Sequence, residues 1–346
     1  VYPFDQGAIA SSLVILRNYF FNICDDEFLL LYLDSPLFFS EIKKYDNGTA
    51  QPNLAAKSLE QFLIPLPPLY EQKRIVAKIE ELLPLVDRYA VAYEKLEQFN
   101  TKFPEDMKRS ILQYAIQGKL VEQRPEEGTG EELYQQIQAK KQRLVKEGKI
   151  KKEKPLPEIT EDEVPFEIPE SWKWERLGDI SSYSQRKGKV IASAISPEMW
   201  TLDLEDIEKE TGRIIRKCTT SDRTISGDKV IFFKGQVLYS KLRPYLKKVL
   251  VAPDNGICSS EMVPFSAYGG VDSQYIVYVL TCPHVDYIIN SVTYGVKMPR
   301  VGTETMTNLL IPLPPLAEQK RIVAKIEELL PYLDRYEKAW NRLEEF

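Results

Sequence analysis

The pattern of hydrophobic and polar positions divides the 346-residue chain into long helical stretches and a region of short strands. Over residues 71–99 the apolar positions recur at alternating spacings of four and three, the heptad pattern of a helix that packs along a second helix. The same pattern returns at the C-terminal end. The predicted helix-pairing residues are Ile75, Ile79, Leu82, Val86, Tyr89, Tyr93 and Leu96 in the first stretch and Ile322, Ile326, Leu329, Leu333, Tyr336, Trp340 and Leu343 in the second.

Both helical stretches belong to an internal repeat. LIPLPPLYEQKRIVAKIEELLP (63–84) returns at 310–331 with one change, Tyr70 to Ala317, and 28 of 37 positions agree between 63–99 and 310–346. A fainter similarity precedes each copy, since LLLYLDSP resembles IVYVLTCP at the same offset. We therefore expect two copies of one module, a globular part followed by a nearly invariant helix, with the two helices paired antiparallel.

The rest of the chain predicts mixed α/β structure. Short apolar runs such as KVIFF (229–233) and QVLYSKL (236–242), separated by glycine turns, predict strands. Two further helices are expected at 104–119 and 130–149, each with a glycine near its end. The predicted organisation is 1–62, the C-terminal part of an incomplete first domain; 63–150, a central region with the helical spacer 71–99 and helices within 104–148; 151–170, a charged, proline-rich, solvated linker; 171–309, the second domain; and 310–346, a C-terminal helix.

Charge is unevenly distributed although the net charge is only −5. Residues 213–248 contain ten Lys or Arg against two acids, a candidate phosphate-binding stripe. A solvated face of a β domain explains the same composition equally well. Inside the stripe, VLYSKLRPYLKKV (237–249) interleaves cations with tyrosines, and the segment 294–300 forms a second loop with two cations.

The sequence carries no recognisable catalytic or metal-binding pattern. It has no GxxxxGK[ST] phosphate loop, no GxGxxG, no CxxC pair among its four cysteines, and one histidine, His284. The E-x-K triplets at Glu71 and Glu318 open the repeated helices, where an acid suits the helix dipole. Without paired cysteines or an uncharged apolar run of membrane-spanning length, we expect a cytoplasmic protein without disulfides or contact with a membrane.

At this point the chain resembles a known family. A PLPPL-x-EQKRIV-x-KIEEL helix that recurs after two variable domains resembles the specificity subunit of type I restriction–modification systems. ILQYAIQGKLV (111–121), FEIPESWKWERLGDI (166–180) and GQVLYSKLRPYLKKV (235–249) support the resemblance. It implies two α/β target recognition domains, here with the first incomplete, separated by long antiparallel coiled-coil helices in a pseudo-twofold repeat. Each domain would read one half of a bipartite double-stranded DNA site.

The resemblance also implies partners and places the chemistry in them. Two methyltransferase (M) subunits would supply the S-adenosylmethionine-dependent reaction, and restriction (R) subunits would use ATP and Mg, so this chain itself needs no cofactor. If the first domain is truncated, the chain could still form a complex with two reading domains by dimerising. The predicted DNA-binding residues are Lys241, Arg243, Tyr245, Lys247, Lys248, Lys297 and Arg300, with Gln51 and Asn53 at the matching loop of the first module.

Two other functions remain open from the sequence. The chain is also consistent with the recognition end of a fused restriction–methyltransferase polypeptide, which would require a methyltransferase domain upstream of residue 1. A purely structural coiled-coil adaptor is the other alternative. The adaptor predicts no salt-dependent affinity for DNA, whereas a protein that neutralises phosphates loses affinity steeply as salt rises.

Overall fold

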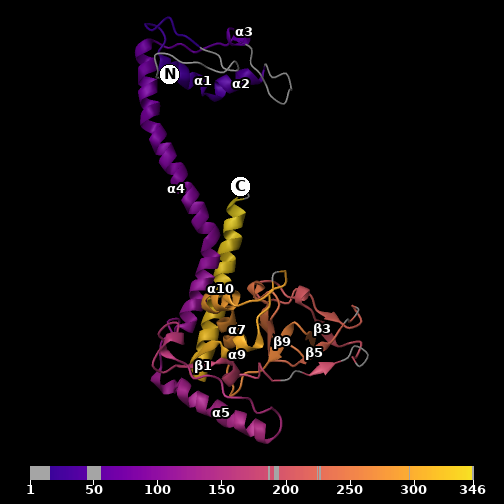
Figure 1. The fold of residues 1–346 in the computed structure, drawn as a ribbon. Helices are drawn as coiled ribbons and strands as arrows, with labels where there is room; N and C mark the ends of the chain where they lie inside the picture. Colours follow the sequence, from indigo (N-terminus) through magenta and orange to yellow (C-terminus); the bar gives the residue numbers. More distant parts are fainter. Residues whose placement is uncertain are drawn as a thin grey trace. The chain divides into compact units, whose positions relative to one another are not determined.

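The structure is a computed structural model that describes residues 16–44, 56–185, 188–190, 195–223, 225, 227–295 and 297–344. The chain divides into two compact units, residues 1–99 and 100–346 (Figure 1). The helix α4 (Leu69–Ile116) passes from the first unit into the second. Of the described residues, no helix is both long and apolar enough to span a bilayer.

The first unit is helical in the part that the structure describes. It contains α1 (Asp26–Leu33), α2 (Pro36–Lys43), α3 (Ala56–Leu59) and the first part of α4. Asp25 caps α1 by accepting hydrogen bonds from the amides of Glu27 and Phe28, both at 3.1 Å. This capping satisfies backbone donors that a helix start leaves without intrahelical partners.

The long helix corrects one prediction. Separate helices were expected at 71–99 and 104–119, but α4 is a single helix of 48 residues that continues through Pro84 and Pro104. Each internal proline removes one backbone hydrogen bond and costs roughly 3 kcal/mol. The surrounding Glu, Lys, Leu and Ala residues are strong helix formers, and the helix continues on both sides of each proline. The repeated helix α10 (Leu316–Glu344) likewise contains Pro331.

The second unit combines helices with three small sheets. Its helices and helical turns are the last part of α4, η1 (Pro125–Glu127), α5 (Gly130–Lys146), η2 (Glu161–Glu163), α6 (Leu177–Ile180), η4 (Leu204–Asp206), η5 (Pro244–Leu246), α7 (Ser273–Thr281), α8 (Pro283–Ser291), α9 (Thr303–Asn308) and α10. Its strands are β1 (Lys173–Arg176), β2 (Lys189–Val190), β3 (Trp200–Leu202), β4 (Cys218–Thr219), β5 (Lys229–Phe232), β6 (Val237–Ser240), β7 (Val249–Val251), β8 (Gly256–Ser259), β9 (Met262–Phe265) and β10 (Leu310–Leu313).

The sheets are mostly antiparallel. The orders are β2-β5-β8-β3-β4, β7-β6-β9 and the pair β1-β10. Only β3 and β8 run parallel among the described strand pairs. Since β1 is the first strand of the second unit and β10 leads into α10, their pairing ties the start of the strand region to the repeated helix. The predicted mixed α/β class is confirmed for this unit.

The main core lies between the β6 sheet, α7, and the helices α4 and α10. Ile322 and Ile326 of α10 are fully buried in it, together with Ile116 at the end of α4. Farther along, the Tyr336 hydroxyl donates to Asn100 Oδ1 at 2.8 Å, and its ring contacts Phe103. Within the second unit, α10 therefore runs antiparallel along the last part of α4 (Figure 1).

The segment 151–170 is largely exposed, as its composition predicts, but parts of it also pack on the second unit. Phe166 and Ile168 pack on the main core. Arg176, only 4% exposed, donates to the backbone carbonyls of Pro157 and Glu158 within this segment. An arginine buried in strand β1 needs acceptors for its donors, and this segment supplies them by lying against the domain.

The two copies of the repeated helix share local hydrogen bonds. In the first unit Gln72 Oε1 accepts from the Asp25 amide at 2.8 Å and Gln72 Nε2 donates to the Pro67 carbonyl at 2.7 Å. In the second unit Gln319 accepts from the Asp272 amide at 2.9 Å and donates to the Pro314 carbonyl at 2.8 Å. Each glutamine is fully buried and fixes the helix to the cap of a preceding short helix.

Candidate nucleic-acid interface

The candidate interface joins two loops of the second unit: the β6 turn, residues 241–247, and the 294–300 loop. The Arg243 amide donates to the Pro299 carbonyl at 2.7 Å, and the Val301 amide donates to the Lys241 carbonyl at 3.1 Å. The Lys241 amide in turn donates to the Glu261 carbonyl at 3.0 Å, next to β9. Segments about 55 residues apart in sequence are thereby held as one surface.

Three positions in these loops adopt positive φ. Arg243 and Lys247 flank η5, each with φ of 49°, and Gly295 has φ of 94°. A side chain in this conformation costs about 1 kcal/mol or more, and such strain persists where surrounding contacts fix the backbone. Here the hydrogen bond of Arg243 to Pro299 and that of the Lys247 amide to the Pro244 carbonyl, at 2.8 Å, hold the turn. The Arg243 side chain is therefore presented from a fixed backbone.

The exposed side chains of this surface combine cations with aromatic rings. Arg243 and Lys297 are exposed and Lys241 is half-buried. Tyr245 and Tyr294 are 47% and 60% exposed. None of these three cations has an ion-pair partner among the described residues. This combination suits phosphate contact by cations and stacking by rings.

Arg300 is in a different state from the other predicted contacts. Its Nε and Nη2 donate to the two carboxylate oxygens of Glu261 at 3.1 and 3.0 Å. The hydrogen bond from Arg300 lowers the pKa of Glu261, so this carboxylate stays charged. Arg300 therefore acts in this structure as a link between the β8–β9 turn and the 294–300 loop. The sequence gave no sign of this pairing.

Lys247 and Lys248 are also committed to intramolecular contacts. Lys247 Nζ lies 3.0 Å from Asp286 Oδ2 in α8. Lys248 Nζ donates to the Leu204 carbonyl at 2.6 Å, and burial lowers the pKa of its ammonium group. Both side chains form contacts within the second unit. Their predicted DNA contacts remain predictions.

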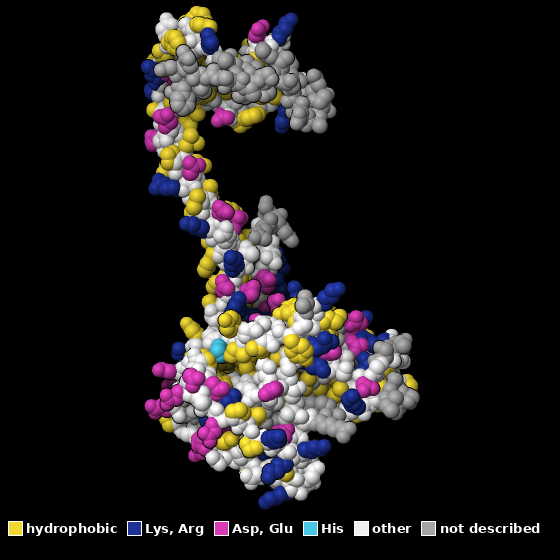
Figure 2. Space-filling model, viewed as in Figure 1, with side chains coloured by type: hydrophobic (Ala, Val, Ile, Leu, Met, Phe, Trp, Pro, Cys, Tyr) yellow, Lys and Arg dark blue, Asp and Glu magenta, His cyan; other side chains and the backbone are white. Residues whose placement is uncertain are grey.

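The basic stripe at 213–248 is largely neutralised by acids from elsewhere in the unit. Arg223 bridges Asp203 and the fully buried Asp206 at 2.8 and 2.7 Å. The ion-paired members are Arg213, Arg216, Lys217, Arg223, Lys229 and Lys247. Figure 2 shows the resulting mixture of basic and acidic side chains over the visible face of this unit. The uniform stripe is thus replaced by a smaller basic site at Lys241, Arg243 and Lys297.

The remaining predicted residues divide by unit. Gln51 and Asn53 lie outside the described residues. In the first copy, five predicted pairing residues have side chains that are 43–69% exposed: Leu82, Val86, Tyr89, Tyr93 and Leu96. Figure 2 shows hydrophobic side chains along this stretch of α4. In the second copy, Leu329 and Leu333 are partly buried against the main core.

Comparison with known proteins defines the class. The family model described as "Type I restriction modification DNA specificity domain" matches residues 5–88 and 169–343. The chain therefore belongs to this family, the DNA specificity subunits of type I restriction–modification systems, which are the non-catalytic members of those systems.

Individual relatives agree. The chain is similar to the EcoAI specificity subunit of Escherichia coli, with 29% identity over 90% of this chain and 60% of that protein. It is similar to the EcoDI specificity subunit of the same organism, with 26% identity over 87% of this chain and 62% of that protein. It thus spans about three-fifths of the length of these curated relatives. The crystal structure of the HsdS subunit from Thermoanaerobacter tengcongensis aligns with a TM-score of 0.38 and 21% identity over 93% of this chain and 68% of that one.

Proposed function

We propose that the second unit reads one half of a bipartite DNA site through the surface formed by the β6 turn and the 294–300 loop. The cations Lys241, Arg243 and Lys297, which form no ion pair among the described residues, carry this proposal, because the other cations nearby are engaged with acids or carbonyl groups of the same unit. Two rings, Tyr245 and Tyr294, flank them. Arginine is suited both to phosphates and to a bidentate contact with guanine in the major groove.

The repeated helices serve as spacer and docking surface in this proposal. The 29 residues of α10 are about 43 Å long, which is commensurate with half-sites one turn of DNA apart, roughly 34 Å. The apolar seam at 82–96 of α4 would be covered by the seam of the other helix, by methyltransferase subunits, or by a second copy of this chain. S-adenosylmethionine, ATP and Mg would be bound by the methyltransferase and restriction subunits.

A methylation map tests the proposal. The chain is co-expressed with the methyltransferase subunit encoded beside it, in a host without adenine methylation, and modified adenines are read by long-read sequencing. A bipartite motif with two unlike halves is expected if two different modules read DNA. A palindromic motif would mean that the second module reads both halves in a dimer. No methylation, with the methyltransferase subunit shown to be soluble and bound, would contradict the proposal.

The structural adaptor is the second candidate, and the exposed apolar seam on α4 is the observation that favours it. It differs from the proposed function in one measurable property. An adaptor leaves the DNA affinity of the assembled complex independent of Lys241, Arg243 and Lys297, whereas a DNA reader does not.

A further inference from the structure

The two copies of the repeated helix have the same sequence but different surroundings at their first two turns. In the second unit, Glu318 is 1% exposed and accepts hydrogen bonds from Gln123 Nε2 at 2.5 Å and Trp172 Nε1 at 2.9 Å. One turn later, Arg321 forms a two-pronged ion pair with Glu127, with distances of 2.8 and 2.6 Å. The start of this helix is therefore covered by a loop and a tryptophan.

The covering loop, residues 118–128, supplies most of these contacts. Besides the side chains of Gln123 and Glu127, the Glu122 carbonyl accepts from Arg321 Nη1 at 3.0 Å. The loop thus presents the Gln123 carboxamide to Glu318 and the Glu127 carboxylate to Arg321. The two loop residues are four positions apart, and their partners on the helix are three positions apart. Beneath this polar layer, Ile322 is completely buried.

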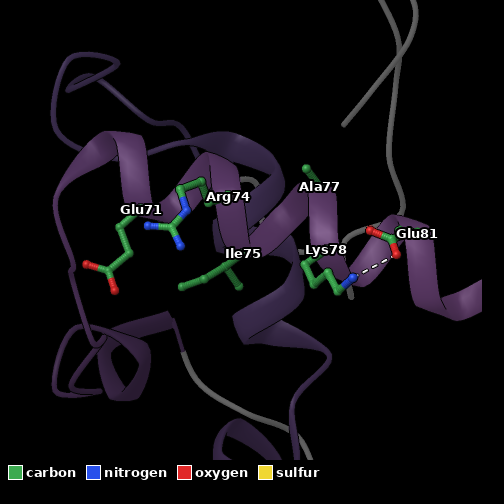
Figure 3. Close-up of a pocket in the computed structure, with 6 residues that line it drawn as sticks. All are labelled: Glu71, Arg74, Ile75, Ala77, Lys78 and Glu81. Atoms are coloured by element: carbon green, nitrogen blue, oxygen red, sulfur yellow. Dashed lines mark hydrogen bonds and ion pairs between the residues drawn. The ribbon is translucent and has the colours of Figure 1, made fainter.

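The equivalent face in the first unit lacks such a cover among the described residues. Glu71, Arg74 and Ile75 correspond to the three residues just described, and they line a shallow hollow of about 440 Å³ with Ala77, Lys78 and Glu81. Figure 3 shows the Glu71 and Arg74 side chains extending from the same side of α4 as Ile75. Arg74 is exposed, and Glu71 and Ile75 are half-buried.

The rest of the hollow is already arranged as in the covered copy. Lys78 and Glu81 form an ion pair at 2.7 Å, and the equivalent pair, Lys325 and Glu328, lies at 3.0 Å. The buried glutamine that follows the glutamate makes the same hydrogen bonds in both units. The helix start in the first unit is therefore preformed, and the side chains of Glu71 and Arg74 have no hydrogen-bond or ion-pair partner among the described residues.

We propose that the face made by Glu71, Arg74 and Ile75 is a docking site for a polypeptide loop with the chemistry of residues 118–128. The occupant carries a carboxylate for Arg74 and, four residues before it, a carboxamide for Glu71. The charges support this choice, as do the 21 identities in the 22 repeated residues, because the same glutamate, arginine and isoleucine in the second copy bind such a loop. The contact does not depend on DNA, so it stands or fails separately from the proposed function.

A peptide titration tests this site directly. The full chain, labelled with carbon-13 at the isoleucine δ1 methyl groups, is titrated with the peptide GKLVEQRPEEGT, which is residues 118–129, up to about 5 mM, a range that detects weak binding. We expect a saturable shift of the Ile75 methyl signal, assigned with an Ile75→Val variant. The same peptide with Glu127→Lys should give no such shift. No shift with the native peptide, or equal shifts with both peptides, would overturn the proposal.

Charge exchange supplies the specificity control. In the Arg74→Glu chain the native peptide should lose its effect, and the Glu127→Lys peptide should regain one. Arg88→Glu, an exposed position on the same helix outside the hollow, should bind the native peptide as the original chain does. Circular dichroism confirms that each variant is folded. Sedimentation that shows a dimer dissolved by Arg74→Glu would assign this face to a second copy of the chain and overturn the proposed occupant.

Discussion

Replacing Arg243 by alanine should weaken DNA binding by the assembled complex and reduce its salt dependence. Each phosphate contact contributes about 0.9 to the slope of log affinity against log salt. Between 50 and 200 mM salt, one contact therefore accounts for about a 3.5-fold change in affinity, and the three cations of the proposed site together for about 40-fold. If all the cations of the 213–248 stripe contacted phosphates, the change would exceed about 10⁵-fold.

The assay is fluorescence anisotropy with a duplex that contains the mapped site, at several salt concentrations, on complexes of equal composition. Arg213→Ala is the matched control, since Arg213 lies in the same basic stretch and is exposed, but pairs with Glu208 at 3.2 Å. It should leave both affinity and slope unchanged. The reasoning is refuted if Arg243→Ala keeps the original slope and affinity, or if both variants lose affinity equally.

Three further predictions concern stability and order. Burial raises the pKa of Glu175 to about 7 despite the nearby Lys173, so the folded state retains a proton that the unfolded state releases. The free energy of unfolding should therefore fall by up to roughly 3 kcal/mol as pH rises from about 4.5 to about 7. Denaturant titrations of Glu175→Gln should lack this fall. Trp172→Phe removes a hydrogen bond to the buried Glu318 and should lower stability by about 1–3 kcal/mol, seen as a lower thermal midpoint; an unchanged midpoint would contradict it. Gln72→Ala deletes hydrogen bonds to the Asp25 amide and to two carbonyls, so hydrogen exchange in residues 23–33 should accelerate while exchange in α10 stays the same.

The helices and several strands could be predicted from local pattern. The heptad register located α10, and the apolar runs placed β5 and β6 within about two residues of their ends. The wrong prediction of a new helix at Pro104 shows the limit of local sequence signals, because a proline suggests a helix boundary but does not decide whether the flanking turns continue the helix. The contacts of segment 151–170 could not be predicted for another reason: its backbone carbonyls accept hydrogen bonds from Arg176, whose burial follows from the tertiary fold.

The candidate site was only partly visible in the sequence. Lysine and arginine in alternation with tyrosine identified the β6 turn, yet sequence alone could not separate Arg243 from Lys247. Lys247 is neutralised by Asp286, and Arg300 by Glu261, each 39 residues away along the chain. Charge runs therefore overestimate a phosphate surface wherever distant acids fold against it. Tyr294 was not predicted as a site residue. It lies at the site because it pairs with Arg300, which also pairs with Leu242 of the β6 turn.

The repeat shows how much of a surface its own sequence determines. The Lys–Glu pair and the glutamine's hydrogen bond to a proline carbonyl are reproduced in both copies because the groups involved lie within the helix or the segment just before it. Burial is not reproduced: Ile322 is fully buried, while Ile75 is half-buried. The difference arises from the loop at 118–128 and from Trp172, which lie outside the repeat. The nearly invariant helix thus presents the same glutamate, arginine and isoleucine face twice. The segments that fold onto each copy decide whether that face is covered within the chain or is available to a partner.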